Sequence, residues 1–169
     1  AGNNYEQFVC TLKNLYGTIE ISDKAIRASA GNEGAFVNIL NDEMQALIKS
    51  SEFHFGRMLY GDGSGKITGS TVAVADESTG LITVDDVSNV FEGMIVDFCS
   101  PTGGRIAGAQ GRMILSVDRT NKKIKVSGTA LDNDMLGSTC YMTLQNSQEK
   151  EITGLGALFG SSTTLYGVK

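Results

Sequence analysis

The chain has 169 residues, of which 41% are hydrophobic and 20% charged, proportions typical of a globular protein with one domain or two small ones. No apolar run approaches the ~20 residues that a membrane-spanning helix needs, and no signal peptide opens the chain, so we expect no membrane partner. The formal net charge of −5 argues against a sequence-specific nucleic-acid binder, which needs a basic face.

The chain first presents two strand-like segments and a short helix. Residues 8–15 and 18–21 are predicted to be extended strands. Ser22 and Asp23 then offer an N-cap, which predicts a short helix over residues 23–29.

A long amphipathic helix follows, and it is the most informative feature of the sequence. Asn32 is its candidate N-cap, and the glycine-rich residues 61–65 (GDGSG) are expected to end it. A helix of about 25 residues is ~40 Å long. Apolar residues recur at steps of three or four on one face, which we expect to be buried against adjoining strands. This face contains Phe36, Leu40, Met44, Leu47, Ser51, Phe55 and Met58, widened by Val37, Ile48 and Leu59.

The middle of the chain, residues 69–146, changes to short strand patterns separated by Gly, Asn, Asp and Ser. In the alternating segment 122–127, Ile124 and Val126 are expected to point inward. Five or six short strands at this spacing predict a small antiparallel barrel or sandwich. Strands are expected over residues 71–75, 81–85, 94–99, 112–118, 122–127 and 140–144, with turns at 78–80 and 119–121.

The last residues, 147–169, show no clear helix or strand and are interpreted as a return to the helical part. The predicted fold class is therefore α+β. We expect a helical body formed by residues 1–68 and 147–169, with residues 69–146 as an inserted β-rich domain.

The turn GDGSGK at residues 61–66 suggests a phosphate-binding loop at first sight. A Walker A loop needs a glycine five residues before its Gly-Lys pair and Ser or Thr after it, but Tyr60 and Ile67 stand there. The turn also follows a helix, whose dipole disfavours an anion at that end. We therefore expect no nucleotide.

A calcium loop fits the same turn poorly. Asp62 and Ser64 match the first and third ligand positions, but Lys66 stands at the fifth and Ala73 at the twelfth. The turn is predicted to be a helix stop and a change of chain direction.

His54 is the only histidine, so any histidine-based catalysis or metal binding depends on it. It lies between Phe53 and Phe55 with no Ser or Cys nucleophile signature nearby, which favours a structural histidine.

Paired carboxylates occur at Asp42-Glu43 on the long helix and at Asp85-Asp86 beside a strand. Adjacent residues point in different directions in both structures, so neither pair presents two acids to one substrate. We predict that the protein is not an enzyme and that it has no catalytic residues, cofactor or metal; small-molecule partners are not expected.

Arg119, Lys122, Lys123 and Lys125 form the strongest local charge cluster. Such a hairpin is able to contact nucleic acid or an acidic partner. Because no aromatic residues are interleaved, a solvated strand face is the favoured interpretation.

Cys10, Cys99 and Cys140 are widely spaced and odd in number, which is neither a disulfide framework nor a CxxC metal site. We expect reduced, mostly buried thiols in a cytoplasmic setting.

The order of residues 18–25 (TIEISDKA), the amphipathic run 36–59 and the turn 59–65 (LYGDGSG) resembles the major capsid proteins of tailed phages, which have the HK97-type fold. In that family a strand from the extended E-loop enters the peripheral domain, and the long spine helix ends in a Gly-Asp-Gly turn. Residues 152–167 are similar to the stretch where such coats re-enter the main body. The resemblance implies a fragment that lacks nearly all of the axial domain, the N-terminal arm and half of the E-loop.

The resemblance further implies a structural subunit of a phage or prophage icosahedral capsid, made in the bacterial cytoplasm and located in the virion. Its partners would be other copies of itself, with scaffolding and portal proteins as further candidates; no cross-linking residue can be placed. The alternative hypothesis is a β-rich module with a helical stalk that binds a ligand or a host surface. A small hydrolase, the third hypothesis, lacks an assembled site.

Overall fold

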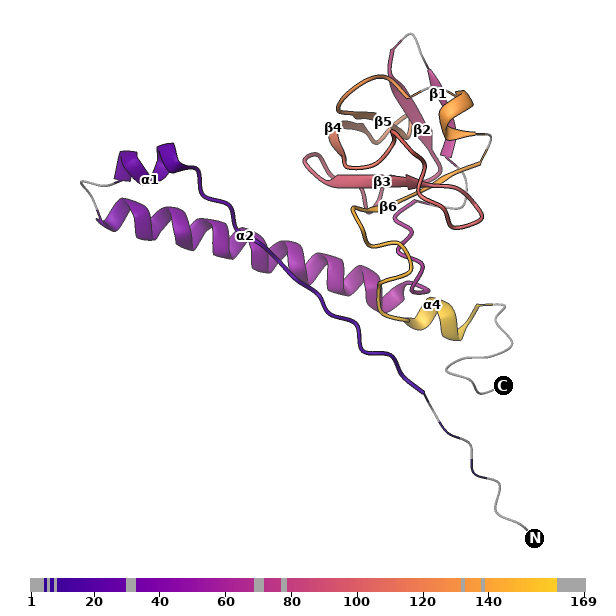
Figure 1. Cartoon of the computed structure of the whole chain (residues 1–169), viewed down its shortest axis with the longest axis horizontal. Coiled ribbons are helices and arrows are strands. Elements are labelled where there is room, and N and C mark those ends of the chain that lie inside the picture. Colours follow the sequence, from indigo (N-terminus) through magenta and orange to yellow (C-terminus); the bar gives the residue numbers. More distant parts are fainter. Residues whose placement is uncertain are drawn as a thin grey trace.

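The computed structural model describes residues 5, 7, 9–29, 33–68, 72–76, 79–131, 133–137 and 139–160. Mixed helices and one antiparallel sheet make the fold α+β, which confirms the predicted class at this level. A long helix with a short helix beside its beginning carries the β-rich part, residues 67–144, near its far end (Figure 1).

The short helix α1 spans Asp23–Ser29, as its capping signal predicts. The hydroxyl of Ser22 accepts a hydrogen bond from the N–H of Ala25 (3.2 Å), which satisfies one of the free donors at the helix start. Asp23 and Arg27 form an exposed ion pair across one turn (2.8 Å).

The long helix α2 spans Glu33–Tyr60, and its 28 residues correspond to about 42 Å. Its predicted N-cap, Asn32, lies outside the described residues. The predicted stop is confirmed, because the N–H of Gly61 donates to the carbonyl of Met58 (3.1 Å) and the helix goes no further. The carboxylate of Asp62 then accepts a hydrogen bond from the N–H of Ser64 (2.9 Å) and closes the turn.

The strand prediction for the N-terminal segment is wrong. Residues 9–21 form no strand within the described part of the chain, and they cross α2 in an extended conformation (Figure 1). Gly17 lies so close to Leu47 of α2 that a Cβ atom would be 2.5 Å from its Cδ1. The physical reason is that a strand needs a hydrogen-bonded neighbour, and no described segment of this chain pairs with it.

All six predicted strands are present, with bounds that differ from the predicted ones by at most one residue at each end. Gly80, with φ of 65°, forms the predicted turn between the first two, while Ser78 of that turn lies outside the described residues. The strands are β1 (Val72–Asp76), β2 (Leu81–Val84), β3 (Ile95–Cys99), β4 (Arg112–Asp118), β5 (Lys123–Val126) and β6 (Tyr141–Leu144).

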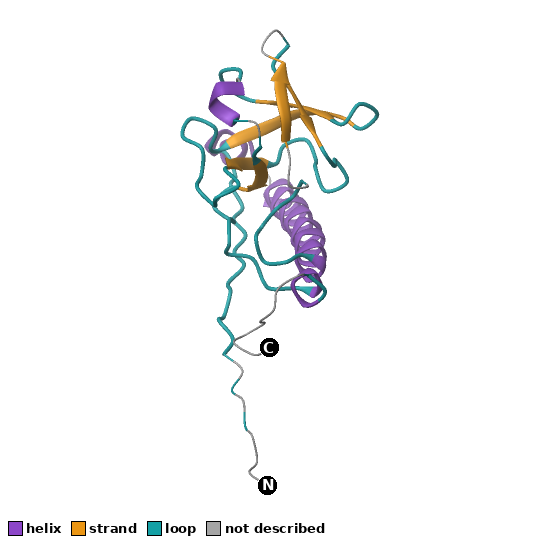
Figure 2. Cartoon of the chain, turned by 90° about the vertical axis from the view of Figure 1, so that its right-hand side faces the viewer, coloured by secondary structure: helices purple, strands orange, loops and turns teal. Residues whose placement is uncertain are grey.

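The strands form one sheet in the order β1-β2-β5-β4-β3-β6, antiparallel throughout. The first residues of β4 pair with β3 and the rest pair with β5, and a β-bulge lies between Ile114 and Ser116. A bulge bends its strand and increases the local twist, and the strands cross steeply in Figure 2. Among the described residues β1 and β6 do not pair. One bent open sheet thus replaces the predicted closed barrel or two-sheet sandwich.

The hydrophobic core lies in the β-rich part. Ile124 and Val126 are both buried, which confirms their predicted orientation. From α2 only Met58 is a buried hydrophobic residue within the described part of the chain. The most deeply buried apolar side chains are Val90, Val96, Phe98, Cys99, Ala109, Ile124, Cys140 and Met142.

Two four-residue helices were not predicted: α3 (Asn133–Leu136) and α4 (Leu155–Leu158). Four residues are too few for a helical hydrophobic period to be recognised. α4 corrects the expectation that residues 147–169 contain no helix, and it belongs to the return segment, residues 145–160, which passes beneath the end of α2 (Figure 1).

Gly154 of the return segment and Gly56 of α2 provide a matched pair of alanine substitutions. A Cβ atom on Gly154 would lie 2.4 Å from the carbonyl oxygens of Met58 and Leu59, whereas one on Gly56 would meet nothing within 4 Å. We expect Gly154→Ala to lower the free energy of unfolding by about 1–3 kcal/mol through overpacking. Gly56→Ala should raise it by about 0.5–1 kcal/mol because alanine has less freedom in the unfolded chain. Urea unfolding followed by far-ultraviolet circular dichroism measures both, and equal effects would contradict the close approach.

Candidate functional site

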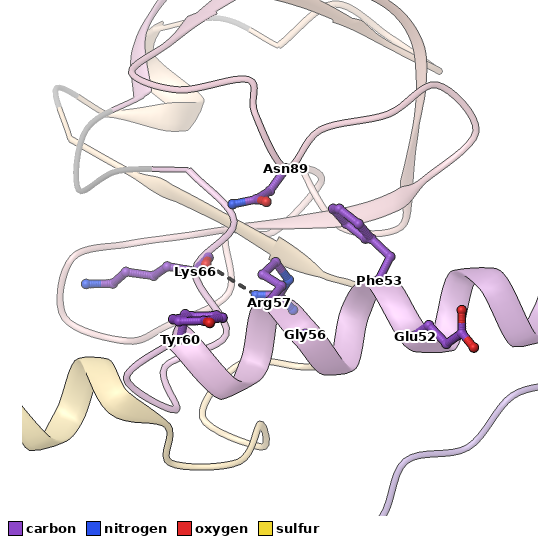
Figure 3. A pocket seen from close by; sticks show the side chains of 8 residues that line it. Glu52, Phe53, Gly56, Arg57, Tyr60, Lys66 and Asn89 are labelled. Atoms are coloured by element: carbon purple, nitrogen blue, oxygen red, sulfur yellow. Dashed lines mark hydrogen bonds between the residues drawn. The ribbon is translucent and has the colours of Figure 1, made fainter.

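The end of α2 is held to the rest of the molecule by one buried arginine. The guanidinium of Arg57 forms an ion pair with the carboxylate of Glu151 in the return segment, and the two side chains are only 7% and 4% exposed. Its Nη1 also donates to the carbonyl of Lys66 (3.4 Å; dashed line in Figure 3). Arg57 therefore joins α2, the segment that leaves it and the segment that returns to it.

Backbone hydrogen bonds hold the same three segments together. The N–H of Glu149 donates to the carbonyl of Ser64 (3.0 Å), and the N–H of Gly156 donates to that of Gly61 (3.1 Å). A β-bridge between Lys66 and Thr143 adds a further connection. The chain thus enters and leaves the β-rich part at neighbouring positions beside the end of α2.

A groove of about 520 Å³ lies beside this junction and is called here the Arg57 groove. Figure 3 shows Phe53, Arg57 and Tyr60 of α2 on one side and Asn89 of the β-rich part on another. The ammonium group of Lys66 points away from Arg57 and lies over the ring of Tyr141 (4.9 Å). The groove combines aromatic side chains with cations, and the cation that is buried is already paired with Glu151.

The apolar face of α2 is largely exposed, and this corrects the predicted burial. Met44 and Phe55 are 46% and 49% exposed, whereas Met58 is buried as expected. Leu40 and Leu47 are half-buried, and the side chain of Phe36 lies outside the described residues. The hydrophobic period identified the face correctly, but within the described chain the adjoining elements cover only part of it.

Five exposed apolar residues of α2 share one side of this face. Their intervals along the helix are seven, four, seven and four residues, which places them on a narrow stripe. Each is between 44% and 53% exposed. We call this stripe the apolar row; it contains Val37, Met44, Ile48, Phe55 and Leu59.

The GDGSGK turn has a structural role, because its polar side chains interact with one another. Burial raises the pKa of Asp62, but hydrogen bonds from Ser64 and the charge of Lys66 outweigh this effect and hold it below the usual value. The hydrogen bonds of Asp62 that the structure gives are to Ser64. Among the described residues, no group of three or more His, Cys, Asp or Glu side chains lies close enough to hold a metal ion.

The paired carboxylates are not brought together with other catalytic groups. Asp42 and Glu43 are exposed on α2, far from the junction. Asp86 accepts hydrogen bonds from the N–H (3.0 Å) and hydroxyl (2.7 Å) of Ser88, and these bonds lower its pKa. The carboxylate of Asp86 therefore stabilises the turn between Asp86 and Ser88.

The positive charges of the basic hairpin are partly offset by neighbouring carbonyl and carboxylate groups. Arg119 donates to the carbonyls of Val87 (3.0 Å) and Val90 (3.2 Å), so its charge is used within the β-rich part. Lys122 lies near Asp86, and Lys123 lies near Asp118. This arrangement favours the predicted solvated strand face over a nucleic-acid surface.

All three cysteines are free, and two of them are buried as expected. Burial raises the pKa of Cys99, and it raises that of Cys140 to about 11, with Cys99 nearby as a further cause. Both are therefore thiols at neutral pH and poor nucleophiles. Cys10 is exposed.

Sequence reasoning missed the Arg57–Glu151 pair and the close approach of Gly154. The two charged residues are 94 positions apart, so no local pattern links them. The only available signal was the pair of glycines, Gly154 and Gly156, which often mark a close backbone approach.

No helix within the described ranges is both long and apolar enough to cross a membrane. Comparison with known proteins gives no matching family model, and no curated protein or solved structure is significantly similar to the chain.

Proposed function

We propose that the protein is a structural subunit of a phage or prophage icosahedral shell with HK97-type architecture, acting by packing against other copies of itself. The observation that carries the proposal is the apolar row of α2. A 28-residue helix with five apolar side chains about half exposed on one stripe has a surface suited to another protein surface.

The order of the elements supports the same function. α1, α2, the Gly-Asp-Gly turn and the return segment follow each other in the order that the resemblance implies, although the strand expected before them is absent from the described residues. In this proposal the β-rich part is an inserted domain that projects from the shell. Scaffolding and portal proteins would be further partners of such a subunit.

Simple energetics make this mode of action reasonable. Covering the remaining surface of a half-exposed apolar side chain contributes roughly 1 kcal/mol. Five such residues give a weak contact between two copies once the cost of association is included. A closed shell repeats the contact many times, so weak contacts suffice for a stable assembly.

The test is to express the complete product of the gene that encodes this chain and to examine it by electron microscopy. We expect uniform closed shells or rings of subunits. The double substitution Met44→Glu and Ile48→Glu should abolish them while leaving the circular dichroism spectrum unchanged, because both positions are exposed in the single chain.

Ala46→Glu is the matched control, since Ala46 is exposed on the opposite side of the same helical turn. This variant should assemble normally. A complete protein that stays monomeric at high concentration, or shells that form equally well with both charges in the apolar row, would contradict the proposal.

One observation favours the alternative, a β-rich module that binds a ligand or a host surface. Ile95 and Met113 are directly opposed on β3 and β4, and both are more than 40% exposed, as is Leu115. A monomeric complete protein that loses binding to its host surface when Met113 is replaced by Glu would support this alternative.

A further inference from the structure

The contact between α2 and the β-rich part contains the only histidine of the chain. The ring of Phe53 on α2 meets the ring of Phe91 edge-on, with 4.9 Å between centroids, and meets that of His54 at 5.4 Å. A groove of about 620 Å³, the His54 groove, lies beside these rings. It is lined by α2 on one side and by residues 91–95 and Leu144 of the β-rich part on the other.

The environment of His54 suits a neutral imidazole. The side chain is half-buried, and its Nδ1 atom is buried with no hydrogen-bond partner in the described part of the chain. A neutral imidazole can leave one ring nitrogen without a donor, whereas a protonated ring has a donor on both nitrogens and a charge. Burying such a charge without a partner is unfavourable.

Charged groups reach the His54 region from each element packed there. Glu151 raises the pKa of His54, but it is already paired with Arg57. Burial and the charge of Arg57 act in the opposite direction and are stronger, so the pKa of His54 lies below its usual value. The charged residues that line the two grooves are Lys49, Glu52 and Arg57 of α2, Lys66 of the segment that leaves it and Glu92 of the β-rich part. Glu151 of the return segment pairs with Arg57, and Arg119 lies over Phe91.

We propose that His54 makes the contact between Phe53 and Phe91 sensitive to pH, so that protonation in mildly acidic solution separates α2 from the β-rich part. The junction formed by Arg57 and Glu151 remains as the pivot of this movement, because α2, the segment that leaves it and the return segment meet there. The effect occurs within one chain and does not depend on shell assembly.

The direction follows from proton linkage. In the separated state His54 is exposed and titrates near its usual pKa of about 6.5. In the closed state it binds a proton less readily. The closed contact is therefore fully stable above about pH 6.5 and weakens as the pH falls towards the lower pKa of the closed state. Each unit of difference between the two pKa values changes the closing equilibrium about tenfold.

The experiment uses the absence of tryptophan from the chain. Phe91→Trp introduces a single reporter at the contact, at a position that is 41% exposed and tolerates the larger ring. Between pH 7.5 and pH 5.5 we expect its fluorescence to shift to the red and to become more accessible to acrylamide. The far-ultraviolet circular dichroism spectrum should stay unchanged, which separates the movement from unfolding.

The control is the same reporter combined with His54→Gln, which keeps a polar neutral side chain and should show no acid response. An unchanged acid response in that variant would overturn the proposal. The single histidine also gives one unambiguous imidazole signal in nuclear magnetic resonance of the unsubstituted chain. A titration midpoint at or above about 6.5 would overturn the proposal independently of the reporter.

Discussion

Replacing Glu151 by alanine is expected to lower the free energy of unfolding by about 3–5 kcal/mol. The substitution leaves the guanidinium of Arg57, which is 7% exposed, without its carboxylate partner. An unpaired buried charge is far less favourable than a paired one, and here it would lie where three segments of the chain meet. Urea unfolding followed by circular dichroism measures the loss.

Two further variants separate this effect from the loss of any carboxylate. Asp23→Ala removes one partner of the exposed Asp23–Arg27 pair, and we expect less than about 0.5 kcal/mol. Replacing both members of the buried pair, with Arg57→Met and Glu151→Leu together, should restore most of the stability because no charge remains buried. If Glu151→Ala lowers the free energy of unfolding by less than about 1 kcal/mol, the pair is not buried in solution.

The second large effect concerns the core of the bent sheet. Phe98 on β3 is fully buried, and we expect Phe98→Ala to lower the free energy of unfolding by about 3–5 kcal/mol. The removed ring leaves a cavity between strands that the bulged sheet can close only in part. Thermal and urea unfolding both measure the change.

The control lies on the same strand. Ile95 is 44% exposed, and its replacement by alanine should cost less than about 1 kcal/mol. Similar losses at the two positions would mean that β3 does not have one buried and one exposed end, and the described sheet would then be wrong.

The elements that were predicted correctly depend on local signals. The cap at Ser22 marks the beginning of α1, and the alternation around Ile124 marks β5. Each signal involves residues within a few positions of each other, so the sequence is sufficient to place it. The same holds for the end of α2 at Gly61.

The errors concern features that depend on distant partners. Residues 9–21 have a strand-like sequence, but whether they pair depends on a neighbouring strand that the described chain does not provide. Phe55 and Met58 lie one helical turn apart on the same predicted face, yet the first is exposed and the second is buried. The hydrophobic period gives the direction of a face and contains no information on what covers it.

The closure of the sheet was missed for a related reason. Strand spacing is the same in a barrel, a sandwich and a bent open sheet. The difference here depends on the bulge between Ile114 and Ser116 of β4, and on the fact that β1 and β6 do not pair with each other within the described residues. A bulge of one residue changes the alternation of apolar and polar residues in a seven-residue strand too little to be recognised.

The neighbouring entry and exit of the β-rich part decide which changes of length the chain can accept. The N–H of Ile67 donates to the carbonyl of Met142 (2.8 Å), and Lys66 is bridged to Thr143, so the two chain crossings are adjacent. Segments whose ends lie side by side can be lengthened, shortened or exchanged without moving the structure that carries them. The β-rich part can therefore be exchanged for a different module, or for a simple turn, while α2 and its return segment stay in place.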